Sequence, residues 1–305
     1  MPIARANHCA AFVQGWLVVV GGNRASAGGF VKTAEVDATR VRDDGSLEGW
    51  KVVGSAPAPV TECTAAASGD RVFVVDGIYD DVTKGQQVWS ATVSVDGAVS
   101  PFTALGALPA GRRAISQAAW VRDATLYVTD AQLPDAGDTT GTLRTPLDGP
   151  LAWSTDDFVR HFLGRPQYAA SHDFVWVLGG YGGTAAGGTV GDVEVAAIGA
   201  GGAVGPSSAT TALPRPTTFG QAIAVDDWVF VVGGREAPLG GTARPDVVSA
   251  SIARDGTLGA WTARAPLPEA RSNFQLTRAG DFLIVTGGGN AGGGLDTVFA
   301  ARVRF

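Results

Sequence analysis

The sequence is poor in charge and in cysteine, and it has no long apolar run. Charged residues fill 17% of the 305 positions, and two cysteines can make neither a disulfide framework nor a Cys-x-x-Cys zinc site. Acidic residues outnumber basic ones by 29 to 23 without any Lys/Arg-rich run, which argues against a nucleic-acid partner. Apolar runs such as Trp16–Val20 have only strand length, so no membrane span is expected. A hydrophobic content of 45% excludes a disordered chain.

Glycine is abundant, with 43 residues, and it recurs at a fixed period. A short apolar run that ends in a small or turn-forming pair occurs six times, and the second residues of successive pairs are 50 to 55 positions apart. The pairs are Gly21-Gly22, Asp76-Gly77, Thr129-Asp130, Gly179-Gly180, Gly233-Gly234 and Gly287-Gly288. An internal repeat of this length predicts one array of similar units rather than several unrelated domains.

Each repeat predicts four short strands. Asp-Gly pairs such as Asp44-Gly45 and Asp255-Gly256 separate strand-like runs and predict type I′ hairpins. No segment has a sustained helical period. The sequence therefore predicts an all-β fold, a single six-bladed β-propeller of four-stranded antiparallel blades whose last blade lacks its outer strand. The expected blades are residues 1–54, 55–105, 106–154, 155–209, 210–263 and 264–305.

Several features of the repeats resemble kelch repeats. They are the double glycine, the Leu-Pro entry at Leu108-Pro109 and Leu267-Pro268, the arginine before the first strand, and a trailing tryptophan. The segments 44–50 and 255–261 look like those of bacterial kelch-like proteins. The resemblance covers essentially the whole chain. It implies the propeller fold and a role in ligand binding or protein interaction, because kelch domains are mostly used in that way.

The two ends of the repeat array leave two alternatives open. Either blade six is a genuine three-stranded blade with Thr297–Val303 as an exposed edge, or Met1 is an artificial start from which an upstream strand and a signal peptide were removed. The second alternative would favour an extracytoplasmic location. Cys9 and Cys63 lie in neighbouring inner strands, and we expect two buried free thiols there rather than a disulfide.

Two classes of positions are expected to line the central mouth, on the face that carries the longer loops. Counting back fifteen positions from the second residue of each pair gives Asn7, Glu62, Ile115, Arg165, Phe219 and Asn273. The residues that follow the pairs are Asn23, Ile78, Ala131, Tyr181, Arg235 and Gly289. In the eukaryotic kelch ubiquitin-ligase adaptors, these two classes carry the ligand-contacting residues.

By this resemblance, Arg165 and Arg235 would contact an anion, with Tyr181 and Phe219 between them. A planar guanidinium beside aromatic faces suits a carboxylate-bearing ligand, either a small molecule or a peptide. Glu62 lies across the ring from these residues. An equally open alternative is that Arg165 and Glu62 form an ion pair across a water-filled channel.

One enzymatic alternative is a sugar-acid enzyme that resembles the kelch sialic acid mutarotases. The two arginines would hold the carboxylate of the substrate, and Glu62 or His8 would move a proton at the anomeric centre. A copper-radical oxidase site needs two converging histidines, which His8, His161 and His172 cannot supply in this repeat register. We therefore expect no metal and no cofactor. A monomeric binding module is the first hypothesis.

Overall fold

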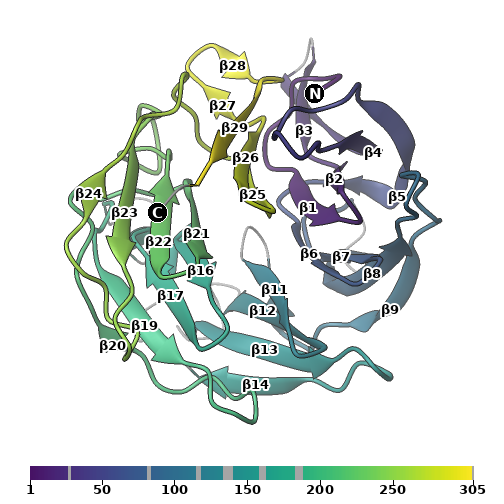
Figure 1. The fold of residues 1–305 in the computed structure, drawn as a ribbon. Coiled ribbons are helices and arrows are strands. Elements are labelled where there is room, and N and C mark those ends of the chain that lie inside the picture. Colours follow the sequence, from purple (N-terminus) through teal and green to yellow (C-terminus); the bar gives the residue numbers. More distant parts are fainter. Residues whose placement is uncertain are drawn as a thin grey trace.

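The computed structural model shows six small antiparallel sheets arranged in a ring, with one strand of each sheet nearest the centre (Figure 1). This arrangement is the predicted six-bladed β-propeller. The structure describes residues 1–26, 29–80, 84–114, 118–132, 140–157, 163–182 and 188–303. Within these residues, no helix is long and apolar enough to cross a membrane.

Each blade is a meander that starts at the centre and ends at the periphery. The innermost strands are β1 (Cys9–Val13), β6 (Thr64–Ser68), β11 (Ala119–Arg122), β16 (Gln167–Ala170), β21 (Gln221–Val225) and β25 (Gln275–Ala279). The second strands are β2 (Trp16–Val20), β7 (Arg71–Val75), β12 (Thr125–Gln132), β17 (Phe174–Leu178), β22 (Trp228–Val232) and β26 (Phe282–Thr286). The third strands are β4 (Gly29–Arg40), β8 (Gln87–Thr92), β13 (Thr140–Pro146), β19 (Val193–Ala197), β23 (Val247–Ser251) and β29 (Val298–Arg302). The outer strands are β5 (Lys51–Val60), β9 (Thr103–Ala107), β14 (Ser154–Asp157), β20 (Ser208–Ala209) and β24 (Thr262–Ala263).

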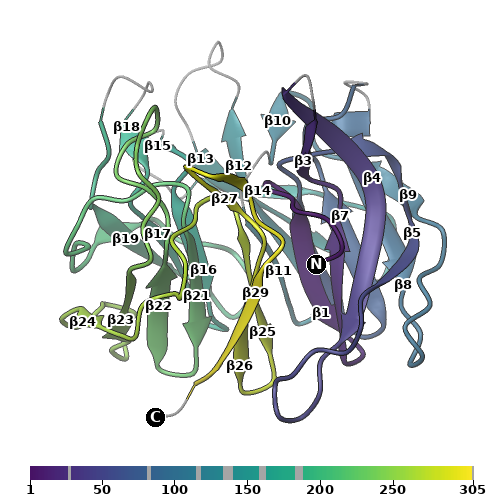
Figure 2. The same ribbon diagram turned by 90° about the horizontal axis from the view of Figure 1, so that it is seen from above.

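Short additional elements lie on the side of the ring that carries the longer loops. They are β3 (Asn23–Ser26), the 3-10 helix η1 (Lys84–Gln86), β10 (Arg112–Arg113), β15 (Leu163–Gly164), β18 (Tyr181–Gly182), β27 (Gly289–Asn290) and β28 (Gly293–Gly294). Figure 2 shows β3, β10, β15 and β18 gathered toward one end of the ring. The strand β3 pairs antiparallel with the start of β4, from Asn23 with Lys32 to Ser26 with Gly29.

The core consists of apolar layers between neighbouring blades rather than of one central cluster. The second strands are apolar on both faces, as in β2, whose five residues are all buried. One layer joins blades one and two through Val18 and Val74, and another joins blades four and five through Leu178 and Val231. A four-stranded sheet cannot bury both of its faces alone, so this packing explains why the blades form a closed ring.

The Asp-Gly turns differ from the predicted type I′ hairpins. In three of these pairs only the glycine has positive φ, which is 81° at Gly45, 86° at Gly97 and 82° at Gly256. The Gly45 amide donates to the Arg42 carbonyl at 2.8 Å, and the side chain of Asp44 accepts the Ser46 amide at 2.8 Å. The side chain of the aspartate thus stabilises the turn, and the backbone of the aspartate stays outside the left-handed region.

The turn glycines also provide space for packing between blades. A Cβ atom on Gly45 would lie 2.3 Å from the ring of Phe282 in blade six, and one on Gly97 would lie 2.4 Å from the ring of Trp16 in blade one. Each of these turns therefore lies directly on an aromatic ring of the preceding blade. The repeated Asp-Gly sequence is required by this close contact as well as by the turn.

The ring closes between blades six and one through backbone hydrogen bonds. The Gly288 amide donates to the Arg5 carbonyl at 2.9 Å, and the Asn7 amide donates to the Asn273 carbonyl at 2.9 Å. Blade six has only β25, β26 and β29 in the described residues, as predicted. The strand β29 is consequently an edge, and its last three residues are exposed.

The expectation of two free thiols is wrong, because Cys9 and Cys63 form a disulfide. Cys9 begins β1 and Cys63 directly precedes β6, and these inner strands lie side by side at the centre of the ring. Their Cα atoms are 5.4 Å apart, a distance that a disulfide spans without strain. The bond links blade one to blade two.

The arginines before the first strands are part of the scaffold. Arg5 is buried and donates to the Gly21 carbonyl at 3.1 Å, and Arg271 donates to the Gly287 carbonyl at 2.8 Å. Each arginine thus stabilises the glycine pair of its own blade. Arg113 instead reaches back to blade two and contacts Asp76 at 3.1 Å.

Candidate functional site

The centre of the loop-bearing face is lined by residues in a left-handed backbone conformation. Five of the six positions counted from the repeat register have φ between 50° and 59°: Asn7, Glu62, Arg165, Phe219 and Asn273. The sixth position, Ile115, lies outside the described residues. Side chains other than asparagine and aspartate rarely adopt this conformation. Its recurrence at the same point of five repeats fixes the direction of five side chains at the mouth.

Backbone hydrogen bonds join these residues from blade to blade. The amide of Glu62 donates to the carbonyl of Asn7 at 2.7 Å, and the amide of Asn273 donates to the carbonyl of Phe219 at 3.0 Å. The bond from Asn7 to Asn273 that closes the ring belongs to the same series. Among the described residues, these side chains are therefore carried by one connected series of backbone hydrogen bonds from Arg165 round to Glu62, which we call the backbone circle.

The residues that follow the pairs form a second circle above the first. Asn23 bridges Ala6, Tyr181 pairs with Gly164, and Arg235 bridges Thr218. Each partner directly precedes a left-handed residue of the first circle. The two position classes expected from the repeat register are thus stacked at the mouth.

Arg165 and Glu62 form an ion pair across the mouth, with Nη2 of the arginine 2.5 Å from Oε2 of the glutamate. Their side chains are 23% and 14% exposed, so water reaches this pair only in part. They line a cavity of about 40 Å³, which has room for one or two water molecules. We call this cavity the constriction. The ion-pair alternative left open by the sequence is the arrangement found.

Arg235 and the two aromatic residues form a stack beside this ion pair. The guanidinium carbon of Arg235 lies 3.8 Å from the ring centroid of Phe219, and that of Arg165 lies 5.3 Å from it. Tyr181 stacks on Phe219 with the ring centroids 6.2 Å apart. Phe219 is therefore placed between two cations and a second ring.

Arg235 is the cation of the mouth that has no carboxylate partner among the described residues. Its Nε is buried without a hydrogen-bond acceptor in that part of the chain. Burial, with a smaller contribution from the charge of Arg165, lowers the pKa of Arg235 from its usual value. A half-buried guanidinium near a second cation favours an incoming anion.

A larger cavity of about 450 Å³ lies above the constriction, over blades five, six and one. Its lining includes Asn7, Asn23, Phe30, Arg235, Asn273 and Asn290. We call this cavity the bowl. Asn7 and Asn273 line both the bowl and the constriction, so the two cavities are adjacent. From the sequence, Asn290 is expected to be loop surface rather than part of the site, and Phe30 is not among the candidates. In the structure the side chain of Phe30 is 68% exposed.

His8 does not face the bowl as an acid or base. Its side chain is fully buried, and its Nε2 lies 2.9 Å from Oγ1 of Thr286 in blade six. Burial, and then the positive charge of Arg5, lowers the pKa of His8 to about 3. A neutral, enclosed imidazole packs the blade interface, so we leave His8 out of the candidate site. His161 lies outside the described residues.

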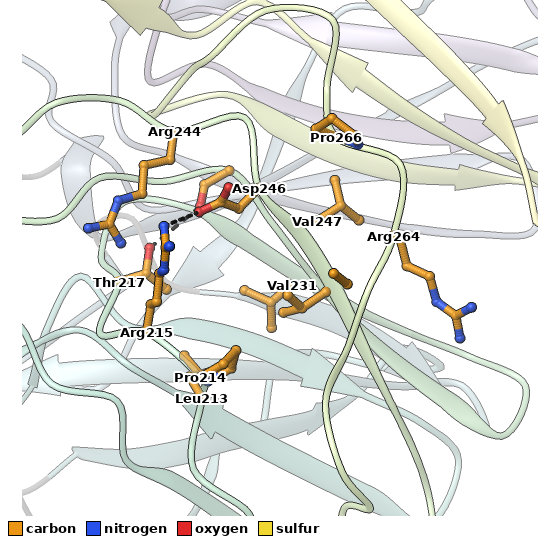
Figure 3. A pocket seen from close by; sticks show the side chains of 13 residues that line it. Leu213, Pro214, Arg215, Thr217, Val231, Arg244, Asp246, Val247, Arg264 and Pro266 are labelled. Carbon is orange, nitrogen blue, oxygen red and sulfur yellow. Dashed lines mark hydrogen bonds and ion pairs between the residues drawn. The ribbon is translucent and has the colours of Figure 1, made fainter.

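A separate cavity of about 430 Å³, which we call the lateral cavity, is lined by residues of blade five and by Arg264 and Pro266 at the start of blade six. Figure 3 shows its apolar floor around Val231 and Leu213, with an ion pair of 3.7 Å between Arg215 and Asp246 at one side. It shares no lining residue with the constriction or the bowl. Among the described residues, no group of three or more His, Cys, Asp or Glu side chains could hold a metal ion.

Comparisons with known proteins identify the fold. No family model matches the sequence, and no curated protein matches it in a sequence search. Among solved structures, one described as the structure of YjhT is similar to this chain, with a TM-score of 0.74 and 13% sequence identity. The match covers 100% of this chain and 96% of the other. At this identity, the similarity establishes a shared propeller fold and nothing finer.

Proposed function

We propose that this chain is a kelch-type propeller that binds a carboxylate-bearing ligand, a small molecule or a peptide, in the bowl and at its constriction. The observation that carries the proposal is Arg235, a half-buried guanidinium stacked on Phe219 and lacking a carboxylate partner among the described residues. A guanidinium offers a carboxylate two parallel hydrogen bonds, which gives both affinity and orientation.

The surroundings of Arg235 support a ligand that is polar on one side and flat or apolar on the other. The bowl adds asparagine amides, which donate and accept hydrogen bonds, and the exposed ring of Phe30. A volume of about 450 Å³ lies within the range of small-molecule sites. Sugar acids and short acidic peptides meet these requirements.

The disulfide between Cys9 and Cys63 supports an extracytoplasmic location for this activity. Disulfides form and persist in oxidising compartments and are rare in the cytosol. We therefore expect this site to bind a ligand that the protein encounters outside the cytoplasm.

A thermal-shift screen of the purified protein tests the proposal. The panel contains sialic and uronic acids, acidic peptides, and the neutral sugar or amide counterpart of each acid. At a hundred times its dissociation constant, a ligand stabilises the fold by about 2.7 kcal/mol. We expect acids to raise the melting temperature and their neutral counterparts to leave it unchanged. Equal shifts for both forms of each ligand would refute a site built around a guanidinium.

A second candidate function is acid/base chemistry on a sugar acid in the same mouth. The position of Glu62 favours it, since its carboxylate is partly exposed at the constriction next to Arg165. The variant Glu62→Gln distinguishes the two functions. If Glu62 moves a proton, this variant loses turnover while its ligand affinity stays within about tenfold. If the chain only binds, no turnover is found with the wild-type protein for any acid that shifts its melting temperature.

A further inference from the structure

One position of the repeat carries a buried arginine in blades one and six and a threonine in blade five. The residues are Arg5, Arg271 and Thr217. The carbonyl of each accepts the amide of the second glycine of the preceding blade, at 2.9 Å for Arg5, 3.0 Å for Arg271 and 2.8 Å for Thr217. The backbone therefore has the same place in the three blades, and only the side chain differs.

Each of the two arginines fills a buried space between the glycine pair and the third strand of its blade. The guanidinium donates to the carbonyl of the first glycine. It also donates to the side chain of the residue whose carbonyl accepts the amide of that glycine. These contacts run from Arg5 to Gly21 at 3.1 Å and to Glu35 at 2.8 Å, and from Arg271 to Gly287 and Thr297, both at 2.8 Å.

In blade five the corresponding space is the lateral cavity. Its lining contains Thr217 in the place of the arginine. It also contains Gly233 and Asp246, the counterparts of the two acceptors, since the Gly233 amide donates to the Asp246 carbonyl at 2.8 Å. The neighbouring residue of the third strand is Val248, where blade one has Asp37. A threonine is shorter than an arginine, so the space remains open as a cavity of about 430 Å³.

The two acceptors in this cavity have weak partners. The carbonyl of Gly233 receives the hydroxyl of Thr217 at 3.5 Å, which is long for a hydrogen bond. The carboxylate of Asp246 contacts Arg215 at 3.7 Å, in an ion pair whose side chains are 49% and 71% exposed. Such a pair is weak, and the exposed Arg215 does not fill the space. A carbonyl and a carboxylate held in this way favour an incoming donor with a positive charge.

The other two arginines of the lining are directed to groups outside it. Arg244 donates to the carboxylate of Glu236 at 2.9 Å and to the carbonyl of Pro216 at 3.2 Å. Arg264 donates to the hydroxyl of Ser249 at 2.8 Å. None of these three acceptors lines the lateral cavity. The acceptors that face the cavity are therefore left for a ligand.

We propose that the lateral cavity binds an alkylguanidinium group, which takes the place that an arginine of the chain fills in blades one and six. The guanidinium donates to the Gly233 carbonyl and to the Asp246 carboxylate, and the alkyl stem packs on the apolar floor around Val231 (Figure 3). A planar guanidinium makes both bonds at once, whereas an ammonium is a point charge. The group belongs to a free small molecule or to the arginine side chain of a peptide.

A ligand-observed NMR titration of the 305-residue protein with butylguanidinium tests the proposal. The controls are butylurea, a neutral molecule of the same shape, and pentanoate, an acid of similar length. We expect butylguanidinium to bind at millimolar concentration and at least about fivefold more tightly than either control. Equal or tighter binding of pentanoate would mean that the arginines of the lining govern the cavity, and it would overturn the proposal, as would the absence of any binding of butylguanidinium.

Acetylated, amidated arginine distinguishes the two sources of the group. Tighter binding of this peptide model than of butylguanidinium indicates a polypeptide partner, and weaker binding indicates a free small molecule. Either result supports an alkylguanidinium site.

Two variants assign the binding to the lateral cavity. Asp246→Asn keeps the shape of a half-exposed side chain and should weaken butylguanidinium binding at least about fivefold. Its matched control is Asp227→Asn, an exposed acid outside the lining, which should leave binding unchanged. Thr217→Arg supplies the guanidinium from within the chain and should abolish binding.

Circular dichroism checks that each variant is folded, and Asp246→Asn decides alone if Thr217→Arg does not fold. Binding of butylguanidinium to the folded variants as tightly as to the wild type would overturn the proposal.

Discussion

Glu62, Arg165 and Phe219 adopt a left-handed backbone at the mouth, although their side chains disfavour it. A non-glycine residue in this region costs about 1 to 2 kcal/mol. The surrounding circle of backbone hydrogen bonds holds the conformation in place. Strain of this kind concentrates at functional sites, because the surrounding structure must compensate for it. The large side chains at these positions therefore support the proposal of a binding surface at the mouth.

The backbone circle predicts how Asn273 tolerates substitution. Asn273→Gly should change the free energy of unfolding little, because glycine adopts a φ of 56° freely. Asn273→Val should lower it by about 1 to 2 kcal/mol, because a β-branched side chain is strained there. Urea denaturation of both variants provides the measurement. Equal midpoints for glycine and valine would show that the backbone at this position is not left-handed.

His8 predicts a loss of stability in acid. In the unfolded chain it takes up a proton near pH 6.5, whereas in the folded chain its pKa is about 3. The unfolded state therefore binds more protons between these values, and stability falls as the pH falls through this window. Asp37, whose pKa burial raises to about 6, acts in the opposite direction.

The variant His8→Gln isolates this contribution, because Asp37 is common to both proteins. Between pH 7 and pH 4.5, the wild type should lose about 2 to 3 kcal/mol more of its unfolding free energy than the variant. Urea denaturation at the two pH values measures the difference. The same pH dependence in both proteins would mean that His8 is accessible to protons in the folded state.

At the scale of elements, sequence reasoning was accurate for strands and less accurate for what joins them. The apolar runs before the glycine pairs are the second strands, as predicted. The glycine pair usually ends the second strand. In blade three the pair is Thr129-Asp130 and contains no glycine, and the strand β12 continues past it to Gln132. The Asp-Gly turns were assigned the wrong type because a sequence does not show which of two residues takes the positive φ. In these turns the aspartate side chain accepts the amide two residues further on, and only the glycine takes the positive φ.

The disulfide predicts a measurable link between blades one and two. In the chain-entropy model, closing the 54-residue separation between Cys9 and Cys63 stabilises the fold by about 4 kcal/mol. The double variant Cys9→Ala, Cys63→Ala should therefore unfold at a clearly lower urea concentration. The wild type with reductant should behave in the same way. An unchanged midpoint in both cases would mean that the two sulfurs are not bonded in solution.

At the scale of the whole molecule, the repeat period was sufficient to predict six blades and a three-stranded last blade. The same register placed Arg165, Arg235 and Phe219 at the mouth. It left open whether Arg165 pairs with Glu62, because residues 103 positions apart meet only when the ring is closed. The bowl was also beyond the sequence, because Phe30 of β4 and Asn290 of β27 lie outside the two position classes of the repeat register.

The central claim is that a carboxylate binds at Arg235, and calorimetric titration tests it most directly. The ligand is the acid that stabilises the protein most in the thermal-shift screen, and the proteins are the wild type, Arg235→Ala and Arg215→Ala. Arg215 is an exposed arginine at the lateral cavity and serves as the control. We expect Arg235→Ala to weaken binding at least about tenfold and Arg215→Ala to leave it unchanged. Equal affinity in all three proteins would contradict the account.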